Sequence, residues 1–265
     1  MVRSGWIPTL LFCCVIPSLA FAGERLEVRT LGPDGTLQET GWMYLEAGNL
    51  FRLDPDVDPQ GHPRDNSIIF HADSATFIIL DPVEKDYLTL DPSRIRHFSS
   101  RLREQLENMR RDLDASPTTA APPDAVTPQP KAAEAASQQR VEVRKVGEDE
   151  EGTRYEVSIR GRKVTEVWVK PPAAMGLSPA VLGLIRETSA FYESFMKSLA
   201  MDVPQVAFAD DPFAGIGQMN GFPTKIKDLS TGEVTRIGVA QKLTLDPALF
   251  EPPADYTERA LPPRQ

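Results

Sequence analysis

Apolar and polar residues alternate in short runs from residue 25 to residue 90. Leu26, Val28 and Thr30 alternate with charged residues, and a glycine-containing turn follows at 32–35. A period of two residues is typical of a strand with one buried face, and glycine allows the backbone to reverse tightly. The pattern therefore predicts an antiparallel meander. Its further strands are expected at residues 41–46, 49–53, 67–70, 76–80 and 86–90.

Two helices are predicted where apolar residues recur at steps of three or four. The first begins at Asp91-Pro92, because aspartate caps a helix and proline suits its first turn. Its apolar stripe is Ile95, Phe98, Leu102, Leu106, Met109 and Leu113. The second begins at Ser178-Pro179, with a stripe at Val181, Leu184, Ile185, Thr188, Phe191, Phe195 and Leu199. We expect both stripes to lie on the sheet.

Strand patterns resume after a long interruption, at residues 140–146, 153–160, 163–170, 224–227 and 233–243. Leu249, Phe250 and Tyr256 are expected to dock the end of the chain. Residues 76–80 are apolar at successive positions, which indicates a strand covered on both faces. The predicted fold class is α+β, an antiparallel sheet with two covering amphipathic helices.

The first residues have the pattern of a signal peptide. Arg3 precedes an apolar run over 7–20, and Ala20-Phe21-Ala22 is the small-x-small sequence after which signal peptidase cuts. The run is shorter than the roughly 20 residues that span a bilayer. We therefore expect residues 1–22 to be removed after Ala22 and the mature protein to be periplasmic, without a transmembrane segment.

The chain between the two sets of strands has a different composition. Residues 114–139 are rich in proline and alanine and contain no aromatic residue, so they offer too little apolar surface to offset the entropy of ordering. They are predicted to be a disordered linker. Residues 23–113 and 140–265 each supply strands and one helix, so we expect them to be two parts of one domain.

The charge and cysteine content of the sequence bear on its binding partners and on how it is stabilised. The formal net charge is −9, which disfavours binding to nucleic acid. Cys13 and Cys14 are the only cysteines and lie in the predicted leader, so the mature protein must be stabilised by its core and not by disulfides.

Three motifs imitate functional sites without their full chemistry. Asp54, Asp56 and Asp58, with Asp65 at the twelfth position, resemble a calcium loop, but Pro59 stands where glycine is needed. The favoured interpretation is a solvated acidic loop. His62, His71 and His97 lack the spacing of zinc ligands and are interpreted as ordinary surface or edge histidines. The glycine-rich stretch 215–221 lacks a following lysine for phosphate and is interpreted as a mobile loop. We expect no metal, no cofactor and no catalysis.

Several segments resemble one family. Leu50-Phe51-Arg52-Leu53-Asp54, the strands 67–70 and 76–87, and the closing segments 221–226 and 250–256 are similar to those of uncharacterised bacterial periplasmic proteins related to the lipoprotein-carrier (LolA/LppX-like) half-barrels. The resemblance implies a curved, open half-barrel whose concave face is covered by helices and can hold acyl chains. It carries over no partner-docking residue, so lipoprotein transfer is not implied.

The function hypothesis is an exported, soluble binding or carrier-like protein for a lipid-like or other hydrophobic ligand between sheet and helices. The alternative is an envelope structural or interaction protein with a solid core, which contacts an envelope protein partner and holds no ligand. Aromatic residues lining a cavity and aromatic residues filling a core give the same pattern. The candidate ligand-binding residues are Trp42, Tyr44, Phe70, Phe77, Ile79, Tyr87, Trp168, Phe191 and Phe195.

Overall fold

A computed structural model of the chain describes residues 21–46, 49–95, 97, 100, 104, 108, 111, 141–159, 161–202 and 215–259. Of residues 21 and 195–202 only the backbone is described. The predicted linker at 114–139 and all but the last two residues of the predicted leader lie outside this part of the chain.

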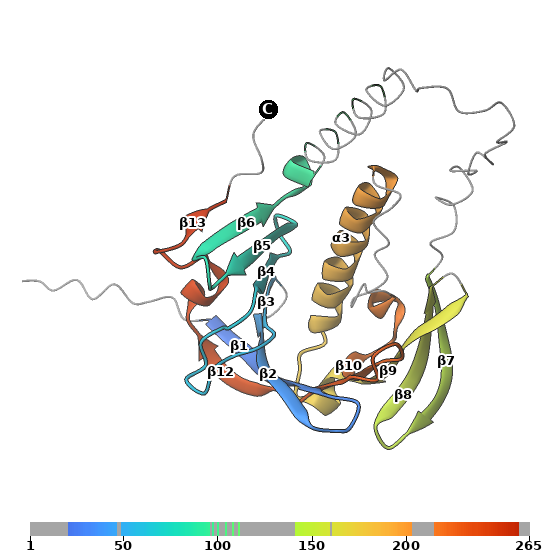
Figure 1. The fold of residues 1–265 in the computed structure, drawn as a ribbon. Helices are drawn as coiled ribbons and strands as arrows, with labels where there is room; N and C mark the ends of the chain where they lie inside the picture. Colours follow the sequence, from blue (N-terminus) through green and yellow to red (C-terminus); the bar gives the residue numbers. More distant parts are fainter. Residues whose placement is uncertain are drawn as a thin grey trace, which may run out of the picture.

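The described residues contain 13 strands in one open sheet, which curves around a long helix (Figure 1). The first half contributes β1 Phe21–Leu31, β2 Leu37–Glu46, β3 Leu50–Asp54, β4 Ser67–His71, β5 Thr76–Asp81 and β6 Asp86–Leu90. The second half contributes β7 Val141–Asp149, β8 Gly152–Ile159, β9 Arg162–Lys170, β10 Phe222–Asp228, β11 Val234–Ile237, β12 Gln241–Leu245 and β13 Thr257–Glu258.

Helical structure is a minor part. The long helix α3 spans Val181–Asp202, and residues 92–95, 97, 100, 104, 108 and 111 are also helical. Three short 3₁₀ turns are η1 Pro172–Met175, η2 Ile216–Gln218 and η3 Pro247–Phe250. No described helix is both long and apolar enough to cross a bilayer.

The fold class expected from the sequence is wrong. The sheet is mixed, because β13 runs parallel to β6, and the protein is mainly one large open sheet, not an α+β antiparallel half-barrel covered by two helices. Local periodicity identifies single elements, but the pairing of Thr257 with Asp86 joins residues far apart in sequence. Only α3 contributes several described residues to the core, whereas Ile95 is the one buried residue described in the first predicted helix.

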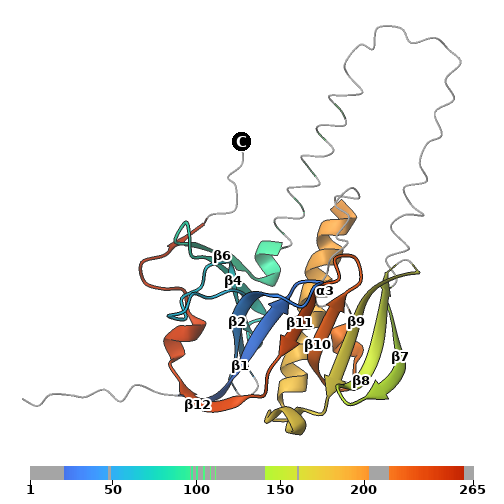
Figure 2. The ribbon, with the colours of Figure 1, turned by 60° about the horizontal axis from the view of Figure 1, so that its bottom comes forward.

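The strand order is β13-β6-β5-β4-β3-β2-β1-β11-β10-β9-β8-β7, and β12 also pairs with β1. The two halves of the chain pair where β1 meets β11 and β12 (Figure 2), and again where β6 meets β13. Because side chains alternate along each strand, the sheet has two distinct faces. We call the face that carries Leu26, Phe70 and Phe77 the inner face, and the opposite face, with Ile69 and Leu80, the outer face.

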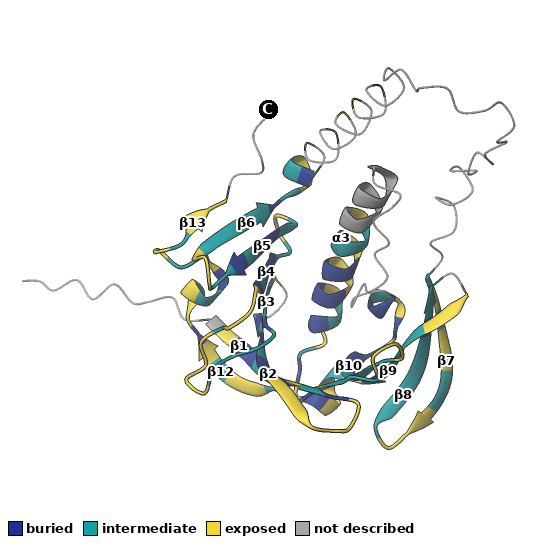
Figure 3. Ribbon diagram, in the orientation of Figure 1, coloured by how far each residue is buried: buried dark blue, intermediate teal, exposed yellow. Residues whose placement is uncertain are grey.

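The main core lies between the inner face and α3. Val181, Leu184 and Ile185 of α3 are buried against inner-face residues such as Leu26 and Phe222 (Figure 3). The expected docking of the second helix through this stripe is therefore present for these residues. A separate group on β7–β9 packs Val157, Val167 and Val169 against Met219.

The outer face of β4 and β5 is covered by the end of the chain. Residues 246–259, which we call the C-terminal segment, place Phe250 against Ile69, Ile78 and Leu80, with Leu249 and Tyr256 packed beside it. Docking of the chain end by Leu249, Phe250 and Tyr256, as the sequence predicts, is confirmed. The segment then ends as β13 on the edge of β6.

Candidate functional site

Three phenylalanines meet on the inner face beside α3. Phe70 of β4 and Phe77 of β5 are cross-strand partners with ring centroids 4.7 Å apart. Phe191 of α3 stacks on Phe77 at 4.8 Å and lies 5.8 Å from Phe70. Offset or tilted pairs at such distances are the favourable aromatic geometry. Helix and sheet are therefore joined here by an aromatic trio.

Apolar side chains that are only half buried extend from this trio. Leu53 of β3, Ile68 of β4, Ile79 of β5 and Leu88 of β6 pack against the main core but stay partly exposed, as does Phe191. We call these five residues the apolar strip. Successive strands place the four aliphatic members on one face, because Ile68 pairs with both Leu53 and Ile79, and Ile79 pairs with Leu88.

The structure gathers four of the nine candidate ligand-binding residues. Phe70, Phe77 and Phe191 form the aromatic trio, and Ile79 belongs to the apolar strip beside it. Phe195 lies in α3, but its side chain is outside the described part of the chain.

The other four candidates lie on the outer face. Tyr44 and Tyr87 pack in the group that surrounds Phe250, and burial raises the pKa of the Tyr44 hydroxyl. Arg25 lies 4.4 Å from the centre of the Trp42 ring, and Lys225 lies 4.1 Å from that of Trp168, which are cation–π distances. Trp168 also donates a hydrogen bond to Asp149 at 2.9 Å. These four residues therefore do not share a site with the trio.

Carboxylates of the acidic loop form ion pairs and hydrogen bonds within the protein. Asp54 is buried and pairs with Arg52 at 2.8 Å, so the expectation of a solvated residue is wrong at this position. Asp58 accepts hydrogen bonds from the backbone of Gln60 and His62, which hold the pKa of its carboxyl below the usual range together with the His62 ring. No group of three metal-ligating side chains occurs within the described residues.

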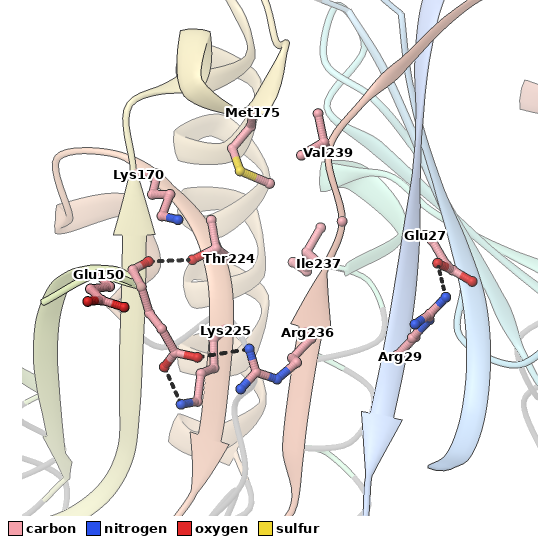
Figure 4. Close-up of a pocket in the computed structure, with 12 residues that line it drawn as sticks. Glu27, Arg29, Glu150, Lys170, Met175, Thr224, Lys225, Arg236, Ile237 and Val239 are labelled. Atoms are coloured by element: carbon pink, nitrogen blue, oxygen red, sulfur yellow. Dashed lines mark hydrogen bonds and ion pairs between the residues drawn. The ribbon is translucent and has the colours of Figure 1, made fainter.

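A cleft of about 510 Å³ that is lined by several charged residues opens where β10 and β11 stop pairing. The β10–β11 pairing ends at Lys225 and Arg236, and the chain beyond β11 instead donates from Gly238 to Glu27 and from Ala240 to Met175. Met175 and Ile237, both core residues, lie among the lining side chains (Figure 4). The charged lining residues are Glu27, Arg29, Glu150, Glu151, Lys170, Lys225 and Arg236.

Most of the charge in the cleft is compensated internally. Arg29 pairs with Glu27 at 2.7 Å, while Lys225 and Arg236 both bind Glu151, the latter at 2.9 Å. The hydrogen bond from Lys225 is the main reason that the pKa of Glu151 is lowered, so this carboxylate stays ionised at neutral pH. Five of the seven charged lining side chains therefore form ion pairs with one another.

Sequence reasoning missed Leu53, Ile68 and Leu88 as site residues. The signal was present, because each lies two residues from a core residue of its own strand and so shares that residue's face. The candidate list favoured aromatic residues over aliphatic ones. The cleft carried no such signal, since its residues come from strands that are distant in sequence.

No family model matches the chain, and no curated protein matches it in sequence. Among solved structures, PNGF-II aligns with 90% of this chain at 8% identity and a TM-score of 0.40, and the chain spans 31% of that protein's length. A LolA superfamily protein from Nitrosomonas europaea aligns over 88% of this chain and 90% of its own, at 9% identity and a TM-score of 0.31.

Proposed function

We propose that this protein is a non-catalytic binding protein that holds a lipid-like, apolar ligand on the apolar strip beside α3. The observation that carries the proposal is the half-exposure of four aliphatic side chains on the inner face of the sheet, beside the half-exposed Phe191 of α3 and its aromatic partners. Covering apolar surface is favourable by about 25 cal/mol per Å². A ligand laid along the strip gains this free energy without displacing the buried core.

The chemistry of the strip sets the ligand class. Leu53, Ile68, Ile79, Leu88 and Phe191 carry no charge and no side-chain hydrogen-bonding group. Recognition would then depend on apolar surface and shape, as in other sites lined mainly by apolar side chains. An acyl chain or a comparable apolar group fits that requirement, and the proposal includes no catalytic step.

Binding of a neutral, fluorescent apolar probe such as N-phenyl-1-naphthylamine tests the proposal. Leu88→Glu places a charge in the strip, and desolvating that charge against an apolar ligand should weaken probe binding at least about tenfold. Leu37→Glu is the matched control, because Leu37 is an exposed apolar residue on β2, away from the strip. Failure of the wild-type protein to bind the probe, or equal affinities for the two variants, would contradict the proposal.

Export belongs to the same proposal. The small-x-small sequence at 20–22 supports cleavage after Ala22, which would start the mature chain within β1 and remove the pairs of Phe21 and Ala22 with β12. N-terminal sequencing of the protein from a periplasmic fraction should read from Gly23. A chain that keeps residues 1–22 would refute export by this route.

The packing of Phe70 against Phe77 favours one rival function. Both rings are buried and in contact, as expected for a solid core without a ligand. An envelope interaction protein of this kind would crosslink to a protein partner and release no lipid on extraction. Extraction of native protein followed by mass spectrometry separates the two functions.

A further inference from the structure

The two edges of the sheet differ. The edge of β6 is paired with β13, whereas β7 pairs only with β8 within the described residues. A bulge between Lys145 and Gly147 interrupts the ladder. We call residues 141–145, before the bulge, the β7 edge. A strand edge carries unpaired backbone groups that can pair with another strand.

Side chains on the β7 edge alternate in a way that suits a specific partner. Val141 and Val143 are half buried on the inner face, while Glu142 and Arg144 are exposed on the outer face. When two copies of this strand pair in the antiparallel direction, the acidic residue of one copy can lie opposite the basic residue of the other. This is the charge complementarity of an isologous two-fold contact.

Within the described residues, the charges next to the edge leave one carboxylate without a cation. Glu156 of β8 accepts from Arg144 at 2.6 Å and from Lys163 at 2.7 Å, so two cations share one carboxylate. The hydrogen bonds from Lys163 and Arg144 lower the pKa of Glu156, which is therefore ionised at neutral pH. Glu142 forms no ion pair within the described residues. Arg144 can thus turn toward a second carboxylate while Lys163 still pairs with Glu156.

We propose that the β7 edge pairs antiparallel with the β7 edge of a second copy of this chain, about a two-fold axis at Val143. This register sets Glu142 opposite Arg144 of the second copy, twice, and Val143 opposite itself. Moving the axis to residue 144 would set Arg144 opposite Arg144, and moving it to residue 142 would set Glu142 opposite Glu142. Like charges directly opposite each other destabilise a sheet, so one register is selected.

The contact is short, and its strength follows from its length. The bulge limits continuous pairing to five residues of each copy. Small interfaces of this kind are weak and reversible. The dimer should therefore dissociate on dilution, and added salt should shift the equilibrium toward monomer, since the paired charges are exposed.

Sedimentation velocity of the full chain over a wide concentration range is the first test. The wild-type protein should change from monomer to dimer as its concentration rises. A wild-type protein that remains monomeric at every concentration would overturn the proposal, whatever the variants do.

Charge reversal tests the register. Glu142→Arg places Arg opposite Arg144, and Arg144→Glu places Glu opposite Glu142, so each single variant should lose the dimer. An equimolar mixture of the two variants should form a heterodimer, because every facing pair then has opposite signs. The double variant carrying both changes should regain the homodimer.

Matched controls carry the same charge changes elsewhere. Glu187→Arg on α3 and Arg64→Glu in the loop between β3 and β4 alter exposed residues away from the β7 edge and should dimerise like the wild type. Single variants that dimerise normally, or a mixture that stays monomeric, would overturn the proposed pairing. A regained dimer in the mixture also shows that both variants are folded.

Discussion

The β6 end of the sheet is closed by the C-terminal segment, whereas the β7 end has no pairing strand within the described residues. At the closed end, Thr257 donates a backbone hydrogen bond to Lys85 and Arg259 donates one to Tyr87. At the other end, the outer-face contacts of β7 include the ion pair of the exposed Arg144 with Glu156 of β8. Within the described residues, the sheet thus has one edge paired with the C-terminal segment and one edge without a strand partner.

The closed end is also held by buried contacts on the outer face. Phe250 is 1% exposed, and Nη1 of Arg52 donates to the carbonyl of Leu249 at 2.7 Å. Nε2 of His71 lies 2.8 Å from the carbonyl oxygen of Phe250, a hydrogen-bonding distance. Buried apolar and charge-assisted contacts contribute far more than exposed ion pairs do. The comparison therefore predicts unequal sensitivity of the two ends to mutation.

Phe250→Ala should have the largest effect. Removing a fully buried phenylalanine and leaving a cavity costs about 3–5 kcal/mol. Val239→Ala, at a residue 65% exposed, should change stability by less than about 0.5 kcal/mol. Urea unfolding measures both values, and a Phe250→Ala protein of wild-type stability would mean that the segment is not docked.

Arg52→Ala should be the next most severe change. Asp54 is 2% exposed, so the substitution leaves a buried carboxylate without its cation, at a cost of about 3 kcal/mol or more. Arg144→Ala removes an exposed partner at the β7 end and should cost no more than about 1 kcal/mol. Equal losses in the two variants would remove the energetic contrast between the ends.

Truncation after Tyr256 should have a smaller, local effect. It removes β13 and the backbone bonds to Lys85 and Tyr87, worth about 1 kcal/mol each before the entropy of ordering is subtracted. Hydrogen exchange should accelerate in β6 and remain unchanged in β8. Unchanged exchange in β6 would show that β13 does not protect this edge.

Lowering the pH should have the smallest effect on stability, and this effect should be confined to the C-terminal segment. The hydrogen bond and charge of Lys85 lower the pKa of Asp255, and Arg94 lowers the pKa of Glu258. A carboxyl whose folded pKa is depressed stabilises above its unfolded pKa, and that contribution is lost as the pH falls below about 4. Proteolysis at the C-terminal segment should therefore increase at low pH before the sheet unfolds. High salt at neutral pH should weaken the same exposed pairs, and resistance under both conditions would argue against their role.

The sequence predicts individual strands well and their neighbours poorly. The run at 86–90 coincides with β6, because its turn formers and β-favouring residues are local. The predicted strand 233–243 instead divides into β11 and β12. Val28 pairs with Ile237, and Arg25 pairs with Gln241. The segment opposite β1 therefore has one extra residue between these two pairs, and the strand breaks there. The extra residue has no local signature.

The site was only partly predictable for a related reason. Trp42 and Tyr44 alternate with Met43 and Leu45, and alternation alone does not say which set faces the helix. Aromatic size suggested the former, but the latter are in the main core. The candidates Phe70 of β4 and Phe77 of β5 lie together because they pair directly across the two strands. The parallel strand β13 depends on a contact that no local pattern encodes.

Photolabelling with a diazirine-bearing fatty acid tests the central claim, that an apolar ligand lies on the apolar strip. After irradiation and digestion, label should appear in peptides from β5, β6 and α3, and unlabelled fatty acid should compete for it. Label confined to the cleft between β10 and β11, or label that unlabelled fatty acid does not reduce, would contradict the account.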